Sequence, residues 1–495
     1  MSKIIIQNGN MCELDLPLKF AQKLYNEFAI RHPNAFYLRT RQRGMQNWDG
    51  KIHYITKTGQ FKIGLLPKVY DMCIEMGIKP KVVDMRQPLP KVSKVVTKIG
   101  KYKLRPEQEK AVKAVINNTI GGKPFHIGVL DYTVNAGKTL IMSSLYLSYK
   151  KQLKTLLITN DSDWLNQARE EFKQYLPGED ITFVQGKVLN WSNFTIGMVQ
   201  SISRNMRFYQ KELSQIDMVL IDEADQGGSR QYQNVITRLF NTRIRIGLSG
   251  TIYMSKLAKD KVKNMNLECF FGKVLAEFKL RDSIKKGYST KTVVKRVPGK
   301  PWYGNWESDC ISYKEIYDDS ITNSYTAWLM AYSRLRWNIN QGRYPALVVC
   351  KHIAHCENLY KFFKKKLGDA YNIAYVHVNT KSKLRQQIMK DFRDGKIDIL
   401  VSTTIIARGK NFPKLRYLLN AASMDSQEKS IQFLGRLVRT DKSKKKVYLD
   451  DLHYPGPYLD RHGKHRKQYY QRQGLKVILL DKLWKKHPNH SLIKS

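Results

Sequence analysis

The stretch that decides the fold is IGVL (residues 127–130) followed directly by DYTVNAGKT (residues 131–139). An apolar strand that enters a Gly-Lys-Thr turn, with a helical pattern immediately after it, is the context that a phosphate-binding loop requires. Backbone N–H groups at the helix start can cradle phosphates, Lys138 can reach the β and γ phosphates, and Thr139 can hold Mg²⁺. Tyr132 stands where such loops usually have their first glycine. The predicted ATP-binding residues of this loop are Val134, Asn135, Ala136, Gly137, Lys138 and Thr139.

A second segment, about eighty residues further on, has the carboxylates that this loop needs. The apolar run MVLI (residues 218–221) predicts a strand, and Asp222-Glu223-Ala224-Asp225 follows it. Asp222 at the end of a strand can bind Mg²⁺, and Glu223 can orient and deprotonate the attacking water. Phosphoryl transfer depends mainly on such positioning and on neutralising charge. The two segments together predict ATP hydrolysis.

A third segment, QFLGRLVR (residues 432–439), predicts a basic helix face. Its spacings of four and three residues place Gln432, Arg436 and Arg439 on one side of a helix. The planar guanidinium stays charged and bonds phosphate in pairs, so two arginines there can approach a γ phosphate held by another domain.

Short apolar runs alternate with helical stretches on both sides of these segments, which is typical of parallel strands joined by helices. The predicted fold class is therefore α/β, with two parallel-sheet domains in tandem and a small α+β N-terminal module. The predicted ranges are 1–95 for this N-terminal module, 96–275 for the first domain, 276–325 for a connecting region, 326–450 for the second domain and 451–495 for a basic tail. The predicted strands are 127–130, 155–159, 194–199, 218–221 and 245–248 in the first domain, and 346–349, 373–378, 399–402, 417–421 and 446–449 in the second.

In this order, the segments resemble the motifs of superfamily 2 helicases. That resemblance implies two RecA-like domains and further site residues, whose motifs are LRPEQ (104–108), VQS (199–201), SGT (249–251) and STT through ARG (402–409). Asn411 stands where many members have a ribose-binding Asp. The resemblance implies adenine reading by Arg105 and Gln108, coupling of hydrolysis to strand movement by Ser249 and Thr251, and nucleic-acid contact by Gln200, Thr403 and Arg408.

The charge balance predicts a polyanionic partner. The 495 residues include 86 Lys and Arg against 42 Asp and Glu, a formal net charge of +44. Such a field attracts nucleic acids and speeds encounter with them. In the N-terminal module, Arg39, Arg41 and Arg43 alternate as on one face of a strand, where they can contact phosphates or remain solvated. Asp49-Gly50 predicts a tight hairpin, at which Trp48 can stack on an exposed base or pack under the hairpin. Arg461–Arg472 in the tail, with Tyr469 and Tyr470, can hold nucleic-acid backbone or be unstructured.

Other site classes are disfavoured. The six cysteines contain no CxxC pair, which argues against zinc ribbons and thioredoxin-type sites. Cys350, His352, His355 and Cys356 are expected at a buried strand end and the next helix start, in core or cap roles. Neither a signal peptide nor a run of about eighteen apolar residues is expected, so we expect a cytoplasmic protein without a membrane span.

Three functions remain open. The resemblance extends to phage helicases that remodel forks, through residues 47–51 and 64–65 of the N-terminal module, and it implies action on branched or forked DNA, R-loops and RNA–DNA hybrids. The literal Asp-Glu-Ala-Asp favours a DEAD-box RNA helicase, but TNDS (residues 159–162) departs from that family's pattern. The third alternative is a basic scaffold without hydrolysis, against which the intact Lys138, Glu223 and Arg436 argue. Oligomeric state is left undetermined.

Overall fold

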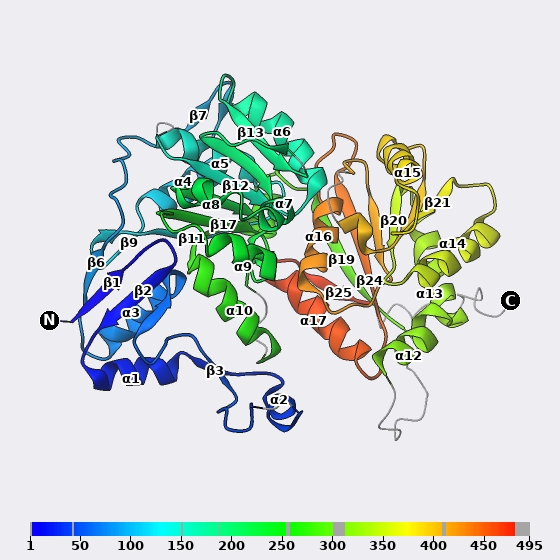
Figure 1. Ribbon diagram of the computed structural model, residues 1–495. Coiled ribbons are helices and arrows are strands. Elements are labelled where there is room, and N and C mark those ends of the chain that lie inside the picture. The colour runs from blue at the N-terminus through cyan, green and yellow to red at the C-terminus, as the bar shows by residue number, and fades with distance from the viewer. Residues whose placement is uncertain are drawn as a thin grey trace. The chain divides into compact units, whose positions relative to one another are not determined.

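The computed structural model describes residues 2–41, 44–149, 152–186, 188–253, 258–299, 312–407 and 412–480. The chain divides into two compact units, one of Met1–Tyr132 with Ala136–Phe278 and one of Thr133–Asn135 with Lys279–Ser495 (Figure 1). Each unit is built around its own parallel sheet. This confirms the predicted fold class of two parallel-sheet α/β domains in tandem.

The first unit has an eight-stranded sheet in which all neighbours are parallel except β13 and β14. Its central strands are short apolar runs whose side chains are buried on both faces, which is typical of parallel sheets covered by helices. In sheet order, the strands are β14 (Val188–Leu189), β13 (Ile181–Gln185), β15 (Phe194–Met198), β12 (Thr155–Thr159), β16 (Met218–Asp222), β17 (Ile244–Ser249), β11 (His126–Tyr132) and β18 (Val274–Phe278). The helices are α4 (Pro106–Ile116), α5 (Lys138–Ser148), α6 (Ser162–Tyr175), α7 (Val199–Arg204), α8 (Gln210–Ser214), α9 (Arg230–Ile236) and α10 (Ala258–Phe271).

The register of this sheet brings three sequence motifs to one edge. Strand β17 lies between β16 and β11, with Asp222 beside Leu248 and Asp131 beside Ser249. Because the three strands are parallel, the segments that follow them leave the sheet at the same carboxyl edge. That edge is the usual ligand site of open α/β sheets.

The N-terminal module is part of the first unit. Its four-stranded sheet has the order β5 (Gln60–Lys62), β2 (Met11–Asp15), β1 (Lys3–Ile6) and β6 (Lys81–Asp84). Around it lie α1 (Leu18–Glu27), β3 (Ala29–Arg31), α2 (Ala35–Arg41), β4 (Lys51–His53) and α3 (Leu66–Glu75). Apolar side chains of the N-terminal module belong to the same buried cluster as those under β11 and α10. The N-terminal module thus shares its core with the first domain.

Buried contacts fix the N-terminal module to β17 and α10. The fully buried Arg245 guanidinium donates to Gly9 O at 2.6 Å and to Asn10 Oδ1 at 2.7 Å. Burial lowers the pKa of Arg245 to about 9, and Arg86 adds to the effect. Gly64 packs so closely on α10 that a Cβ there would lie 2.1 Å from Glu268 O. The close fit leaves no room for any other residue at position 64.

The second unit has a seven-stranded sheet in which every pair is parallel. In sheet order, the strands are β21 (Ile373–Val376), β22 (Ile399–Ser402), β20 (Ala346–Val349), β23 (Tyr417–Asn420), β24 (Lys446–His453), β19 (Lys291–Pro298) and β25 (Val477–Leu479). The helices are α11 (Leu280–Lys285), α12 (Tyr313–Tyr317), α13 (Tyr325–Ile339), α14 (Ile353–Leu367), α15 (Ser382–Asp394), α16 (Gln427–Leu437) and α17 (Leu459–Arg472). Strand β19 comes from the predicted connecting region, and β25 comes from the predicted tail.

Two local predictions are wrong. The arginines 39 and 41 lie on a helix, α2, where residues two apart point in different directions, so they do not form the face expected of a strand. Asp49-Gly50 is not a tight hairpin, since β4 pairs with β3 across the long segment 32–50. Arg43 lies outside the described residues.

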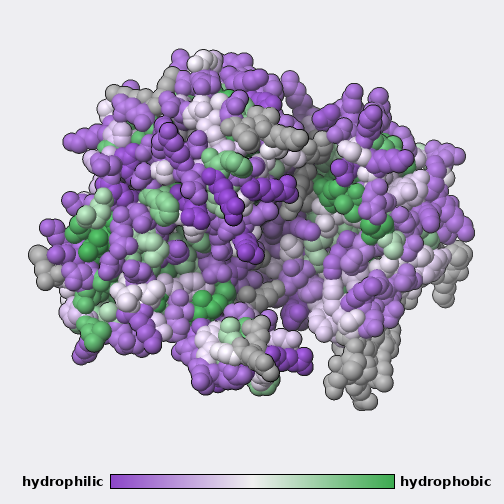
Figure 2. All heavy atoms as spheres, viewed as in Figure 1, coloured by the Kyte–Doolittle hydropathy of each residue, from purple (hydrophilic) through white to green (hydrophobic). Residues whose placement is uncertain are grey.

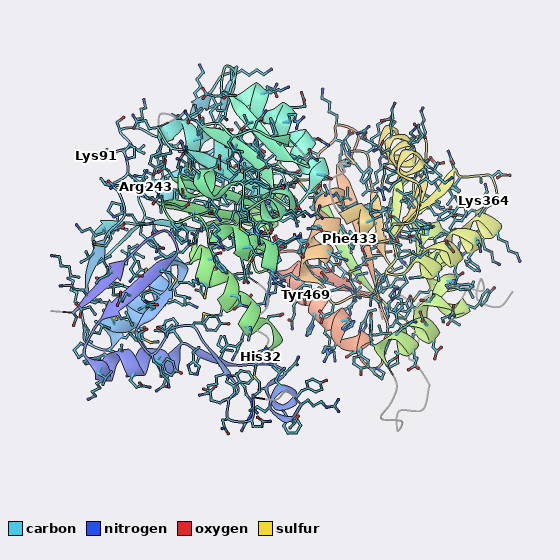
Figure 3. All side chains as sticks on the ribbon, in the orientation of Figure 1. His32, Lys91, Arg243, Lys364, Phe433 and Tyr469 are labelled. Carbon is cyan, nitrogen blue, oxygen red and sulfur yellow. The ribbon has the colours of Figure 1, made fainter. Side chains whose placement is uncertain are left out.

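The described part of the tail is folded rather than unstructured. Arg466 is fully buried in α17 and forms an ion pair with Asp451 at 2.9 Å. Tyr469 and Tyr470 are also buried, which argues against the contact with nucleic-acid backbone that one alternative gave to these two residues. Tyr469 is labelled in Figure 3 and donates to Asp425 Oδ1 at 2.9 Å.

The side chains at the surface are mostly hydrophilic on the face drawn in Figure 2. Cys350, His355 and Cys356 are buried, and His352 occupies the N-cap position of α14 without a side-chain capping hydrogen bond. Cys310 lies outside the described ranges. Within those ranges, no group of three or more His, Cys, Asp or Glu is arranged to hold a metal ion. None of the described helices has both the length and the apolar character needed to cross a bilayer.

Candidate active site

The phosphate-binding loop joins β11 to α5. Its turn needs left-handed backbone at Asn135, with φ of 63°, and at Gly137, with φ of 71°. Glycine suits this left-handed conformation, and a Cβ on Gly137 would lie 2.3 Å from Gln108 Nε2 and displace that amide. Lys138 and Thr139 are the first residues of α5 and are partly exposed. Both are therefore at a helix N-terminus, where backbone N–H groups and the helix dipole favour anions.

Gln108 holds this loop against α4. Its Nε2 donates to Ala136 O at 2.8 Å, and its Oε1 accepts from Arg105 N at 2.8 Å. Both ends of the buried amide are thus engaged within the protein. The sequence predicted that Gln108 and Arg105 bind adenine. In the structure, Gln108 also holds the phosphate-binding loop through its hydrogen bond to Ala136 O.

Tyr132 stands at the position where phosphate-binding loops usually have their first glycine. It is the last residue of β11, its ring is fully buried, and its hydroxyl donates to Glu107 O at 2.7 Å. The loop therefore begins after a fixed strand end rather than at a flexible residue.

The two carboxylates expected at the metal follow β16. Asp222 is the buried last residue of that strand, and Glu223 has left-handed backbone with φ of 53°. Burial raises the pKa of Asp222, and Lys138 opposes the rise. Burial also raises the pKa of Glu223 to about 8, helped by Asp222, Asp225 and Asp161 and opposed by Lys138. The ammonium of Lys138 is therefore near enough to act on both carboxyls.

This group of residues fits a divalent cation and a polyphosphate. Glu223 Oε2 is buried without a hydrogen-bond partner among the described residues, which leaves an acceptor for water or a ligand. The acidic groups outnumber Lys138, the cation that acts on both of them. A cation with oxygen ligands would favour the ionised carboxylates, and Mg²⁺ is commonly held by one or two carboxylates together with phosphates.

Ser249 and Thr251 form a small network with the acidic turn. Ser249 Oγ donates to Asp225 Oδ1 at 2.7 Å and accepts from Thr251 N at 3.0 Å. Ser249 ends β17, and Asp225 is buried in the turn after β16. The network links the two motifs directly.

Gln200 belongs to a neighbouring network. Its Nε2 donates to Asn160 O at 3.4 Å, and Asn160 Nδ2 donates to Gln226 Oε1. The network joins the segments after β15, β12 and β16. Asn160 and Gln226 were not predicted as site residues. Asn160 directly follows the predicted strand 155–159, and Gln226 directly follows Asp225, so their positions could have indicated them.

In the second unit, α16 carries Gln432 and Arg436 but not Arg439. The helix ends at Leu437, so the prediction that all three residues share one helix face is wrong for Arg439. Gln432 Nε2 donates to Glu428 Oε1 at 3.3 Å. Phe433, which follows Gln432 on the same helix and is labelled in Figure 3, has a buried side chain.

The turn that carries Arg439 is held through its backbone. Thr290 N donates to Val438 O at 2.9 Å, and Thr290 Oγ1 donates to Arg439 O at 3.1 Å. The buried Lys444 Nζ donates to Leu437 O and to Leu415 O, each at 3.0 Å. Burial lowers the pKa of Lys444 to about 8, against the opposing effect of Asp441. These supports could not be found from motif spacing.

The predicted nucleic-acid residues of the second unit lie partly within the described chain. Thr403 follows β22 and is buried, while Arg408 and Asn411 lie outside the described residues. Lys429 Nζ donates to Thr404 Oγ1 at 3.1 Å. Burial lowers the pKa of Lys351, and the nearby Lys429 ammonium lowers it further. Two lysines therefore lie close together beside the ends of β20 and β22.

Trp48 of the N-terminal module is engaged within the protein. Its Nε1 donates to Lys51 O at 2.9 Å, and its ring meets His32 edge-on. Arg39 and Arg41 are exposed, and the guanidinium of Arg41 lies over the ring of Tyr37 at 5.0 Å. These contacts within the protein argue against stacking of Trp48 on a base. The exposed Arg39 and Arg41 remain accessible to phosphates.

Comparisons with known proteins agree with the motif order. Residues 101–254 match the family described as "Type III restriction enzyme, res subunit", and residues 331–441 match "Helicase conserved C-terminal domain". The chain is 21% identical over 434 residues to the "ATP-dependent DNA helicase uvsW" of Enterobacteria phage T4, covering 82% of each protein.

Two further comparisons set the limits of the likeness. A protein of Sulfolobus islandicus filamentous virus, named as a candidate helicase, is 23% identical over 381 residues, which is 71% of this chain and 64% of that protein. The chain spans about half to two thirds of the length of the first relatives that it matches. A solved fragment of a candidate HsdR subunit of a type I restriction enzyme from Vibrio vulnificus YJ016 has a TM-score of 0.58 at 14% identity, over 87% of this chain and 77% of that one. With both helicase domains matched in tandem on two parallel RecA-like sheets, the chain belongs to the superfamily 2 helicases.

Proposed function

We propose that this protein hydrolyses ATP and uses the free energy to translocate on or unwind nucleic acid. The observation that carries the proposal is the meeting of three motifs at one sheet edge, after the adjacent strands β11, β17 and β16. A scaffold without hydrolysis would have no need for a buried acidic pair within the electrostatic reach of Lys138. This observation favours an enzyme over the scaffold alternative.

Each residue of the edge has one role in this proposal. The loop backbone from Val134 to Gly137 and the Lys138 ammonium bind the phosphates, and Thr139 and Asp222 hold Mg²⁺. Bound Mg²⁺ neutralises charge on the phosphates. Glu223 orients the attacking water and accepts its proton, a role supported by its Oε2, which has no hydrogen-bond partner among the described residues. General-base assistance of this kind typically contributes about 10²- to 10⁴-fold in rate.

Gln432, Arg436 and Arg439 complete the hydrolytic machinery in the proposal. Two guanidiniums stabilise the charge that develops on the transferred phosphoryl group, which contributes about 10³- to 10⁵-fold in related enzymes. Thr290 and Lys444 hold the backbone of the turn that presents Arg439, which supports a role requiring accurate placement.

Nucleic acid binds, in this proposal, along the strand ends of both units and on the N-terminal module. Gln200, Thr403 and Arg408 contact the backbone, and Lys429 is added to them because its ammonium lies at the Thr404 hydroxyl. Arg39, Arg41 and Arg43 supply further positive charge on the N-terminal module. The formal net charge of +44 supports polyanion binding in general but selects no substrate.

We further propose branched DNA and RNA–DNA hybrids as the substrates, in viral replication or recombination. Similarity to proteins of a phage and of a filamentous virus, one of them named a DNA helicase, supports this choice. The literal Asp-Glu-Ala-Asp sequence and relatives named RNA helicases support the alternative, an RNA helicase.

One experiment separates the two substrates. The protein is mixed with a labelled DNA fork, a four-way DNA junction, an R-loop and an RNA duplex, each with and without ATP and Mg²⁺. We expect ATP-dependent strand rearrangement of the first three and little of the RNA duplex. Binding should weaken steeply as salt rises. Each neutralised phosphate adds about −0.7 to −0.9 to the slope of the logarithm of the binding constant against the logarithm of the salt concentration. Activity on the RNA duplex alone would establish the RNA-helicase alternative instead.

A further inference from the structure

Among the described residues of the N-terminal module, one strongly exposed aromatic ring makes no ring or cation contact. Phe36, in the first turn of α2, has 80% of its surface exposed. Burying such a ring removes a large apolar area from water, so a soluble protein gains nothing by leaving it out. Single exposed apolar side chains are common on protein surfaces, so the surroundings of Phe36 decide whether it lines a binding site.

The other aromatic rings near Phe36 are engaged within the N-terminal module. Tyr37 lies under the guanidinium of Arg41, and Trp48 is fixed by its hydrogen bond to Lys51 and its contact with His32, labelled in Figure 3. Tyr25 stacks on His53 with centroids 4.1 Å apart. Within the described residues, no ring or cation contact of this kind involves Phe36. The face of this ring is therefore available to a ligand.

Phe36 lies on a hollow with the chemistry of a nucleotide site. The hollow has a volume of about 410 Å³, within the usual range for small-ligand pockets of roughly 300–1,000 Å³. It is lined by Arg31, Ala35, Phe36, Arg39, Thr40, Gln46, Asp49 and Gly50. Two cations are thus present for a phosphate, and amide, hydroxyl and carboxylate groups are present for the edge of a base.

Charge in this part of the chain favours a polyanion over a protein partner. Residues 29–51 contain four arginines and one lysine against a single acid, Asp49. That carboxylate is already bonded to His53 Nε2 at 2.7 Å and to Lys51 N at 2.9 Å. The hydrogen bond from His53 is the largest effect that lowers the pKa of Asp49, so the carboxylate remains an acceptor. It can take a hydrogen bond from a base amino group without cancelling both arginines.

We propose that this hollow binds one unpaired nucleotide of a nucleic-acid junction, with its base stacked on Phe36 and its phosphate held by Arg31 and Arg39. The inference rests on the proposed function and adds to it a specific base-contacting residue. Stacking on an aromatic ring is tolerant of sequence because every base has a flat π face. A site of this kind recognises where pairing stops rather than which bases are present.

The hollow is rigidly connected to the domain that carries the phosphate-binding loop. Arg245 on β17 bonds the N-terminal module through Gly9 and Asn10. Tyr54 OH donates to Asn266 Oδ1 at 2.9 Å, and Lys68 pairs with Glu268 at 2.6 Å. Through these contacts, Tyr54, just after β4, and Lys68 on α3 both bind side chains of α10. A nucleotide held at Phe36 therefore moves with this domain during the ATPase cycle.

The test uses full-length protein and a forked DNA with 2-aminopurine as the first unpaired base. Stacking of this fluorescent base on an aromatic ring quenches its emission. We expect wild-type protein to quench it, Phe36→Ala to lose the quenching and to bind the fork about 5- to 150-fold more weakly, and Phe36→Trp to restore both. Phe208→Ala is the matched control, because Phe208 is 79% exposed on the same unit outside the N-terminal module and should behave as wild type.

Arg39→Gln tests the phosphate contact separately. It should weaken fork binding and lower the salt dependence of that binding. The inference is overturned if Phe36→Ala quenches and binds as wild type does, which would leave a protein partner as the occupant. Loss of the proposed function is distinguishable, since wild-type protein itself would then show neither ATPase activity nor fork rearrangement.

Discussion

Ser249 Oγ lies 2.7 Å from Asp225 Oδ1 and donates a hydrogen bond to it. The bond joins the last residue of β17 to the buried turn that follows Asp222 and Glu223. A bond from a hydroxyl to a buried carboxylate is charge-assisted and stronger than a neutral one. A change at the proposed Mg²⁺ ligand Asp222 can therefore reach the segment Ser249–Thr251 through the turn that holds Asp225.

Ser249→Ala should separate hydrolysis from strand movement. Because Ser249 contacts Asp225 and not the loop of residues 134–139, we expect the ATPase rate to fall by less than about tenfold while fork rearrangement falls much further. A hydrogen bond to a charged group typically contributes about 1.5–3 kcal/mol, which sets the scale of the defect. Both activities are measured on one preparation. Ser214→Ala, which removes a hydroxyl on α8 of the same domain, is the control. An equal loss of both activities would place Ser249 in the hydrolytic step itself.

Glu223→Gln should bind ATP and hydrolyse it about 10²- to 10⁴-fold more slowly. The amide keeps the shape of the side chain but cannot accept the proton of water. Equilibrium binding of a fluorescent ATP analogue and steady-state hydrolysis are the two measurements. If the variant failed to bind nucleotide yet kept its rate at saturation, Glu223 would be the metal ligand and Asp222 the base.

Arg436→Ala and Arg439→Ala should each lower kcat far more than they weaken ATP binding, by about 10³-fold or more. The reason is that their proposed partner is charge that develops only in the transition state. Rapid-quench hydrolysis and nucleotide titration separate the two quantities. Arg393→Ala removes an exposed arginine on α15 of the same unit and should have no effect. Parallel losses in binding and rate would indicate that the arginines support structure.

Lys444 should make stability depend on pH. Its folded pKa of about 8 is below the unfolded value near 10.5, so between these values the unfolded chain binds more protons. Stability from this group is therefore lowest below pH 8 and rises as the pH increases towards 10.5. The free energy of unfolding of wild type minus that of Lys444→Met should increase across this window in denaturant titrations. A flat difference would mean that the ammonium is not buried as described.

Much of the sheet framework could be predicted because parallel strands are buried on both faces and are therefore uniformly apolar. Strands 155–159, 346–349 and 399–402 agree with β12, β20 and β22 at both ends. Strand β19 was missed because its sequence, KTVVKRVP, mixes charged residues with apolar ones. Strand β25 was missed because its sequence, VIL, is only three residues long. In α2, arginines at every second position suggested a strand, although Ala35–Leu38 favours a helix start.

The site was predictable only where its residues lie in contiguous motifs. Lys138, Asp222, Glu223 and Ser249 have a signature in sequence, whereas the supports from Thr290 and Lys444 come from distant segments. The burial of Arg245 could not be predicted, because an arginine is expected at the protein surface. Its burial also changes the design of experiments. Deleting residues 1–95 would uncover Arg245 and the shared core, so point variants in the N-terminal module are the cleaner test.

The most direct test of the central claim is the steady-state ATPase rate without nucleic acid and with single-stranded DNA, duplex DNA, forked DNA or RNA. Lys138→Ala serves as the zero reference, because removal of the phosphate-binding ammonium should abolish hydrolysis while the fold is retained. Lys123→Ala, on the exposed strand β10 (Lys123–Pro124), controls for loss of a lysine. We predict that wild-type protein and Lys123→Ala hydrolyse ATP and that DNA stimulates them, with forked DNA the most effective. A rate equal to that of Lys138→Ala under every condition would contradict the account.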